Sequence, residues 1–419
     1  MSIDGGTFVI EAGDDGIQAQ TYLRIAGGDI SIAAVDDALH SNLEGLLAGG
    51  TLDIEAGDDA FHAETKLVID DGAVNVKACY EGYEAEKLYI NGGDTHIVAS
   101  DDAINAAAAD LGDDDADAAA DASAEAPGYE GGTLPDSMEA PEGAPDGMTP
   151  PDGVNGVGGE APELPEGAKS PDATGGTPPS GAPQRNGEGA NERELNGGAP
   201  DNAFAEGGAG GMGMGDENCL IQINGGYTVL DAQGDGVDSN GSVEIAGGVL
   251  LVCGPTSNGD GAFDYDLTAT VTGGTVLMVG SNGMAQNFTS GEQPFAFATV
   301  SGSAGQNVAV VDSDGTVVAS FTAAKQFGMV LATSPAFVEG GTYSLVIGGT
   351  VTGANADGYT DSGTVEGGST TEIAASTTAS GGMGGLGAGG GGMPAGQGGD
   401  VQRGMRGGAG SGFGGGAAA

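Results

Sequence analysis

The stretch AGDDGIQAQTYLRIAGGD, residues 12–29, decides the fold because close copies of it recur along the chain. Each copy contains an acidic residue, an isolated apolar residue, a short apolar run and a Gly-Gly pair or a variant of it. One acid per copy follows at a constant spacing of 22 residues, or 21 in the last case: Asp15, Asp37, Asp59, Glu81 and Asp102. A constant period of this length indicates a stacked repeat protein.

Apolar residues alternate with polar or small ones on both sides of the Gly pair, which is the pattern of a strand with one buried face. A unit of about 22 residues cannot bury this face alone, so neighbouring copies must stack. The frame of a leucine-rich repeat and the nonapeptide calcium repeat are both absent from the sequence. The sequence therefore predicts an all-β chain that folds as a parallel β-helix, with glycines of positive φ at its corners.

Composition divides the chain into five segments. The central segment lacks apolar periodicity, which is typical of disorder, and the repeat resumes after it. Alternating runs around Asp314-Gly315 predict a hairpin, which we expect in a cap over the end of the helix. We predict β-helix coils over 1–106, a disordered acidic Gly/Pro-rich insertion over 107–217, continued coils over 218–294, a β-rich cap over 295–372 and a flexible Gly-rich tail over 373–419.

The sequence begins in mid-coil, since Ile3-Asp4-Gly5-Gly6 matches Ile25-Ala26-Gly27-Gly28, and no signal peptide is visible. We expect that upstream coils are missing from this sequence. The chain has 61 acids and 10 bases, a formal net charge of −51. Such a charge excludes electrostatic binding of nucleic acid or of an anionic membrane. The absence of an apolar run of about 18 residues predicts that no segment inserts into a membrane.

A column of acids is expected at one corner of the coils. Stacked strands lie about 4.8 Å apart, and carboxylates at that spacing repel one another. We expect these acids to be solvated and ionised, so a cation must neutralise them, and Ca²⁺ fits best because it accepts about six to eight oxygen ligands in flexible geometry. The predicted Ca²⁺ ligands are drawn from Asp14, Asp15, Asp36, Asp37, Asp58, Asp59, Glu81, Glu84, Asp101, Asp102, Asp235, Asp238 and Asp260.

Two other interpretations of the corner stay open. Asp and Gly favour turns, and a solenoid repeats its turns, so turn chemistry alone can place acids there. Three residues after the acid stand Gln18, His40, His62, Glu84, Asn105 and Asp238, all of which carry oxygen or nitrogen. The two histidines share one column, where they either bind a transition metal or are exposed turn residues.

The three cysteines are interpreted as partly buried thiols, with one disulfide possible.

The units DDGIQA, DDALHS, DDAFHA, YEGYEA and DDAINA, with the INGG corner and the segment GDGVDSNGSVEIAGG, resemble a family of secreted bacterial carbohydrate-binding β-helix proteins. That family is similar in fold to pectate lyases. The resemblance covers roughly 1–106 and 218–350. It implies a right-handed parallel β-helix, bound calcium, an extracellular or cell-surface location, and binding of plant cell-wall polysaccharide of the cellulose or pectin type.

We therefore expect a non-catalytic, calcium-dependent carbohydrate-binding or adhesion module. Tyr22, Tyr80 and Tyr89 are candidates for stacking on sugar rings, although the chain has no Trp. One alternative is a polysaccharide lyase, in which calcium acidifies a proton and a base removes it; Lys66 and Lys87, which share a column, are the candidate bases. Another is a structural surface protein whose calcium only makes the coils rigid.

Overall fold

A computed structural model describes residues 1–109 and 215–381. These residues belong to one compact unit, which joins Met1–Ala126 with Met212–Ala419. Most of the predicted insertion (107–217) and of the predicted tail (373–419) lies outside the described residues. The described residues form strands and turns only, and no helix suited to crossing a membrane is found among them.

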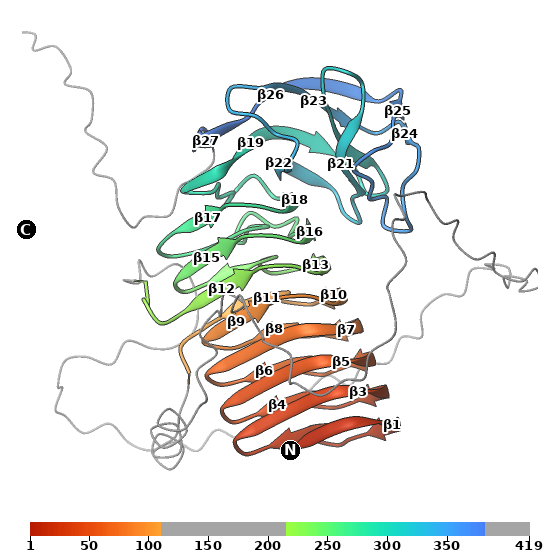
Figure 1. Cartoon of the computed structure of the whole chain (residues 1–419), viewed down its shortest axis with the longest axis vertical. Helices are drawn as coiled ribbons and strands as arrows, with labels where there is room; N and C mark the ends of the chain where they lie inside the picture. The colour runs from red at the N-terminus through yellow and green to blue at the C-terminus, as the bar shows by residue number, and fades with distance from the viewer. Residues whose placement is uncertain (110–214, 382–419) are drawn as a thin grey trace, which may run out of the picture. The chain divides into compact units, whose positions relative to one another are not determined.

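The first four coils each contain a long strand that bends at the glycine corner (Figure 1). These strands pair in parallel and nearly in register with the next coil. They are β1 (Ser2–Glu11), β3 (Tyr22–Ala33), β5 (Glu44–Glu55) and β7 (Lys66–Cys79).

In the later coils this path is divided at the glycine corner into two strands. Both sets pair in parallel with the halves of the long strands, so that two continuous stacks result. Before the corner lie β9 (Lys87–Ile90), β12 (Leu220–Ile223), β15 (Ser242–Ile245) and β17 (Ala269–Val271). After it lie β10 (Asp94–Ala99), β13 (Tyr227–Ala232), β16 (Val249–Cys253) and β18 (Thr275–Gly280).

A third parallel stack of short strands completes the coils. It contains β2 (Ile17–Ala19), β4 (Leu39–Ser41), β6 (Phe61–Ala63), β8 (Tyr83–Glu84), β11 (Ile104–Ala106) and β14 (Asp238–Ser239). The column of residues expected to point inward here is buried throughout: Ile17, Leu39, Phe61, Tyr83, Ile104 and Val237. The predicted parallel β-helix with coils of about 22 residues is confirmed.

Glycine is required at the corners for steric reasons. Gly28 has a φ of 115°, and a Cβ there would lie 2.9 Å from the backbone oxygen of Gly6 in the preceding coil. The second glycine of each later corner also has positive φ, as far along the chain as Gly274, where φ is 85°. Residues with a Cβ rarely adopt a positive φ. The expected positive φ at the corners is confirmed.

The β-helix continues across the segment between 109 and 215. β12 pairs with β9 and β14 pairs with β11, although each pair joins strands from opposite sides of that segment. The backbone N–H of Asn240 donates to the oxygen of Ala106 at 2.9 Å. The coil therefore resumes in register where it was interrupted.

The last coil is closed by antiparallel strands. Within β19 (Ser290–Gly302), pairing changes from parallel at Gly291 to antiparallel from Phe295 onward. β22 (Phe327–Thr333) lies between β18 and β19 and pairs with both, so it covers the open end of two stacks. The short strand β27 (Ser376–Thr378) also pairs with β19, four residues or more beyond the predicted end of the cap at 372.

A four-stranded antiparallel sheet makes up the rest of the cap, in the order β21 (Val317–Thr322), β20 (Asn307–Val311), β23 (Thr342–Ile347), β26 (Ser369–Ala374). The predicted hairpin around Asp314-Gly315 is β20–β21 and is confirmed. β24 (Thr350–Val351) and β25 (Val365–Glu366) form a small ladder beside it. An apolar cluster that includes Leu277, Phe321 and Leu345 joins the cap to the last coils.

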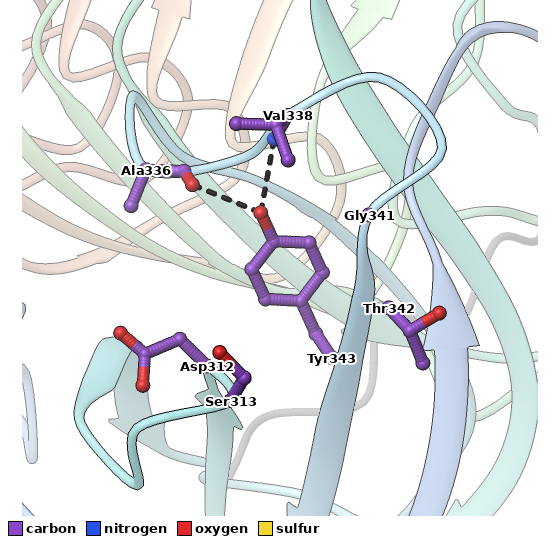
Figure 2. A pocket seen from close by; sticks show the side chains of 7 residues that line it. All are labelled: Asp312, Ser313, Ala336, Val338, Gly341, Thr342 and Tyr343. Carbon is purple, nitrogen blue, oxygen red and sulfur yellow. Dashed lines mark hydrogen bonds between the residues drawn. The ribbon is translucent and has the colours of Figure 1, made fainter.

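The cap contains an open pocket of about 370 Å³ (Figure 2). Two of its polar side chains are engaged in turns of the cap. The hydroxyl of Tyr343 donates to the oxygen of Ala336 and accepts from the N–H of Val338, both at 2.9 Å. Asp312 Oδ1 accepts the backbone N–H groups of Asp314 and Thr316. This pocket is therefore a product of turn packing, and the polar groups of interest lie on the coils.

Candidate functional site

The acids that recur at one corner of the coils lie just before the strands of the third stack. We call them the acidic column: Asp15, Asp37, Asp59, Glu81, Asp102 and Asp235. Its carboxylates reach along the stack to the next coil. Asp37 Oδ1 accepts the backbone N–H of Asp59 at 2.9 Å, and Asp102 Oδ1 accepts that of Asp235 at 2.5 Å. Asp235 does the same for Gly261. Turn chemistry thus explains part of the repeated acid, since these three carboxylates each satisfy a backbone donor.

The expectation of a solvated column is wrong. Asp37 is 6% exposed and Asp59 4% exposed, because a carboxylate that reaches the next coil is also covered by it. The residues just before them in sequence, Asp14, Asp36 and Asp58, are exposed. Desolvation disfavours the charged form of a carboxyl group, so the buried column requires compensation that an exposed one does not.

The seventh position of the column is Gly261 rather than Asp260. The backbone N–H of Gly236 donates to the backbone oxygen of Gly261 at 3.1 Å. In earlier coils the equivalent bond is accepted by the backbone oxygen of an acid of the column. The coil is longer there, which shifts the register by one residue, and the Asp260 carboxylate instead accepts the hydroxyl of Ser257 at 2.7 Å. The same shift brings Asp264, which the spacing did not single out, beside Asp238.

In the N-terminal coils, histidines accompany the buried acids. His40 Nδ1 lies 2.6 Å from Asp37 Oδ2, and His62 Nδ1 lies 3.6 Å from Asp37 Oδ2 and 3.5 Å from Asp59 Oδ2. Burial raises the pKa of Asp37, but hydrogen bonds from the histidines outweigh it and hold that pKa well below its usual range. Burial lowers the pKa of His62, yet Asp37 and Glu84 raise it to about 9. Imidazolium therefore neutralises Asp37, whereas burial and the neighbouring Glu84 raise the pKa of Asp59 to about 10, so that Asp59 keeps its proton.

In the C-terminal half, three acids meet without such a cation. Asp102, Asp235 and Asp238 bring carboxylate oxygens within 4.8 Å of one another, and among residues 1–109 and 215–381 none forms an ion pair with Lys, Arg or His. Burial, followed by neighbouring acids, raises the pKa of Asp102 to about 7 and that of Asp235 to about 8. The same causes raise the pKa of Asp238 well above its usual value.

Asn105 provides a test of whether a cation fits this cluster. Its side chain is 8% exposed and lies on β11, directly opposite Asp238 on β14. The amide nitrogen donates to Glu81 Oε2 at 3.0 Å, while Oδ1 has no hydrogen-bond partner in the described part of the chain. Buried polar atoms are rarely left unpaired. An orphaned acceptor beside three carboxylates is the donor set that a hard oxygen-seeking cation requires, so the residues fit Ca²⁺.

The remaining predicted ligands lie at other places on the same corner. Glu84 approaches Asp59 and His62 and thus belongs with the histidines. Asp14 and Asp36, both exposed, meet the half-buried Asp15 at the N-terminal end, and the exposed Asp36 and Asp58 meet the buried Asp37 beside it. Glu81 accepts from Asn105, and Asp101 interacts with the hydroxyl of Tyr80.

Two of the three candidate tyrosines share a surface. Tyr22 and Tyr89 point outward from the stack that precedes the glycine corner, on neighbouring columns three coils apart. Tyr80 is exposed at the acidic corner and lies apart from them. The two columns form what we call the outward face: Tyr22, Arg24, Glu44, Leu46, Lys66, Val68, Lys87, Tyr89, Leu220, Gln222, Ser242 and Glu244. Its three bases and two acids give one net positive charge on a chain of −51.

The two lysines considered as lyase bases are engaged on this face. Lys66 Nζ lies 2.8 Å from Glu44 Oε1, and Lys87 Nζ lies 2.8 Å from Glu86 Oε1. Neither of these partners is in the acidic column. The three cysteines are all buried and free, so the interpretation as thiols is confirmed.

A family model described as carbohydrate-binding domain-containing protein matches residues 1–122 of the 419. No curated protein and no solved structure matches the chain. The match includes the first four coils, the histidines, Tyr22 and Tyr89. It supports a carbohydrate-binding role and a carbohydrate partner, and it is consistent with a role that is not enzymatic.

Proposed function

We propose that this protein is a non-catalytic, calcium-dependent module that binds plant cell-wall polysaccharide, such as cellulose or polygalacturonate, outside the cell or on its surface. The observation that carries the carbohydrate role is the family match over residues 1–122. The resemblance of the repeat units to secreted β-helix proteins supplies the type of polysaccharide and the location.

The outward face is the surface we assign to the polysaccharide. Parallel strands about 4.8 Å apart make it flat and regular, so Tyr22 and Tyr89 lie about 14 Å apart along the stack. Aromatic rings present an apolar surface to a sugar, while Arg24, Lys66 and Lys87 donate hydrogen bonds to hydroxyl or carboxylate groups. A nearly neutral face accepts an anionic polymer that the rest of this acidic chain repels.

Calcium is assigned to Asp102, Asp235, Asp238 and Asn105. Asp102 and Asn105 precede the segment between 109 and 215, and Asp235 and Asp238 follow it. A divalent cation held by these residues supplies charge neutralisation and connects the two halves of the β-helix. In this proposal the calcium stabilises the coils on which the outward face depends.

A pull-down assay with insoluble cellulose and with immobilised polygalacturonate tests the proposal. We expect retention in Ca²⁺ and release in EDTA. Tyr22→Ala and Tyr89→Ala should each weaken retention by about three- to tenfold, as expected for loss of about 0.5–1.5 kcal/mol of ring contact. Tyr80→Ala is the matched control, because Tyr80 is an exposed tyrosine off the face. Retention that survives both face substitutions and is lost with Tyr80→Ala assigns binding to the acidic corner instead.

The two alternatives give different results in the same experiment. A lyase releases unsaturated uronate, which is followed by its ultraviolet absorbance. A purely structural protein is stabilised by Ca²⁺ but retained by neither polysaccharide. Either outcome rejects the proposed function.

A further inference from the structure

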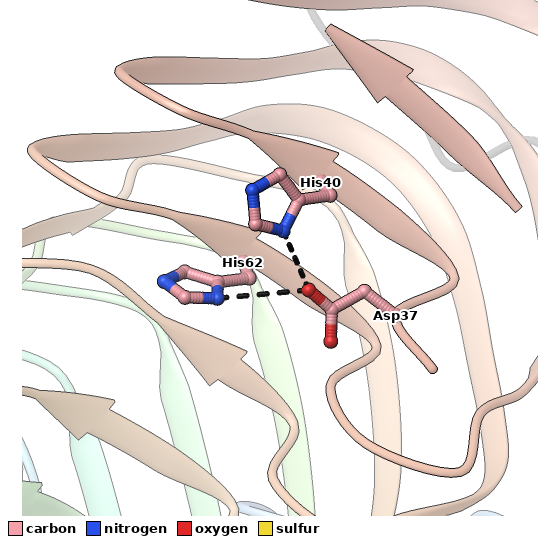
Figure 3. Close-up of side chains that lie close together, drawn as sticks. All are labelled: Asp37, His40 and His62. Carbon is pink, nitrogen blue, oxygen red and sulfur yellow. Dashed lines mark hydrogen bonds and ion pairs between the residues drawn. The ribbon is translucent and has the colours of Figure 1, made fainter. Parts of the chain in front are cut away.

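His40 and His62 form a cluster with Asp37 that the calcium proposal does not use. β4 and β6 pair so that His40 lies directly opposite His62. The two rings have centroids 5.0 Å apart and are inclined by 66°. Figure 3 shows both Nδ1 atoms directed at one oxygen of Asp37. We call these three residues the histidine cluster.

We propose that the histidine cluster is a binding site for a divalent transition metal ion of the Zn²⁺ class, distinct from the calcium site. Metal ligands in this class lie about 2.0–2.2 Å from the ion. A tetrahedron of that size has edges of about 3.4 Å. His62 Nδ1 lies 3.6 Å from Asp37 Oδ2, close to such an edge. One ligand atom each of Asp37, His40 and His62 lie within 4.8 Å of one another.

His40 supplies the third ligand. Its Nδ1 donates to Asp37 Oδ2 at 2.6 Å, so the ring must move outward by about 0.8 Å to reach a tetrahedral edge. Its side chain is 18% exposed and His62 is 22% exposed, which leaves room for that movement and for entry of the ion. The result is a set of two imidazoles and one carboxylate, with the fourth position of the tetrahedron left for water.

The type of ligand separates this site from the calcium site. Calcium takes oxygen ligands, whereas imidazole favours Zn²⁺, Cu²⁺ and Ni²⁺. At the equivalent positions in the later coils stand Asn105 and Asp238, which are oxygen donors. The same column thus changes from nitrogen to oxygen ligands along the chain. His62 Nε2 also faces Glu64 Oε1 at 3.7 Å, and a carboxylate on the other ring nitrogen is the usual support for a metal-bound histidine.

Protons compete with the metal in this cluster. The imidazolium forms that neutralise Asp37 must lose a proton before they bind an ion, so the affinity should rise with pH. If the histidines serve only as counter-ions, Zn²⁺ does not displace these protons. The two roles are therefore separated by direct metal titration.

The test is calorimetric titration of the full chain with Zn²⁺ in excess Ca²⁺, which saturates the calcium site. We expect one equivalent of Zn²⁺, and about a 10–100-fold weaker affinity in His40→Gln and in His62→Gln. His96→Gln is the matched control, because His96 also lies near two carboxylates, at 3.4 Å from Asp94 and 3.2 Å from Asp357. Absence of saturable binding, or an equal loss with His96→Gln, overturns the proposal.

A second measurement does not depend on how the variants fold. The chain contains three histidines, so their ring protons give a simple set of NMR signals. Zn²⁺ should shift two of the three at one equivalent, and Co²⁺ in its place should show the visible absorption of four-coordinate Co²⁺. Signals that all shift alike, or that do not shift, reject the site. This result is independent of polysaccharide binding and of the response to EDTA.

Discussion

Replacing Asp235 with Asn should stabilise the calcium-free protein, although the substitution removes a residue of the repeat. Asn keeps the oxygen that accepts the backbone N–H of Gly261. It removes the charge that burial and the neighbouring acids oppose. The variant therefore isolates the electrostatic contribution of one carboxylate from its structural one.

The magnitude follows from the pKa of Asp235, which rises from 3.8 to about 8 on folding. Between these values the folded state holds a proton that the unfolded state has lost, so stability falls as pH rises, by about 1.4 kcal/mol per pH unit. At pH 7 the loss is about 4 kcal/mol, and Asn avoids it. With about 2–4 °C per kcal/mol in a domain of this size, the variant should melt about 10 °C higher in EDTA.

Thermal unfolding followed by circular dichroism between pH 5 and 8 measures this effect. In EDTA the wild type should lose stability with rising pH more steeply than Asp235→Asn. In Ca²⁺ the difference in stability should narrow, because bound ion stabilises only a protein that binds it, by about 2.7 kcal/mol at a hundredfold excess over Kd. Asp29→Asn, at an exposed acid of β3, controls for net charge. A variant that is less stable in EDTA, or that gains as much from Ca²⁺ as the wild type, would refute the reasoning.

Three further substitutions or titrations test the packing and the charges. Gly57→Ala should lower the free energy of unfolding by about 1–3 kcal/mol, because the added Cβ would lie 2.0 Å from a backbone oxygen of the preceding coil. Gly13→Ala, at the same repeat position but with nothing within 4 Å, should leave urea unfolding unchanged. Equal effects of the two substitutions would contradict the stacking. Phe61→Ala should cost about 3–5 kcal/mol by the same assay, since Phe61 is 1% exposed, and a smaller loss would indicate a collapsible core. In chelator, the His62 imidazole should titrate near pH 9 by NMR; Asp37→Asn should lower this pKa toward its ordinary value, and an unchanged pKa would dismiss the ion pair.

The fold was predictable because a stacked repeat places each sequence position in the same environment in every coil. Phe61 and Tyr83 occupy one inward column although they differ in polarity, and both are buried. Gly28 could be assigned to a corner because no other residue tolerates that backbone and that approach. The cap was predictable as a hairpin, but the position of β22 between two stacks depends on contacts distant in sequence.

The candidate site was predictable in its residue types and not in its arrangement. Spacing identified the acidic column, but the burial of Asp59 depends on the direction in which its carboxylate points. Asp264 was missed because a longer coil shifts the register by one residue. The signal for the calcium assignment is the unpaired side-chain oxygen of Asn105. It is visible only in three dimensions, because it depends on the amide nitrogen of the same side chain being bound to Glu81.

Stacked acids are stable in this β-helix only where something balances each buried charge, and the chain uses two solutions. In the N-terminal coils the balance is internal, since His62 and Asp37 stabilise each other's charged forms. In the C-terminal coils no described base approaches Asp235, so the carboxyl either keeps its proton or binds a cation. We therefore propose that an external cation is used where the coil is interrupted between residues 109 and 215. In our proposal, calcium at this place holds the two halves of the β-helix together, and its removal therefore destabilises the stack of coils on which the outward face with Tyr22 and Tyr89 depends.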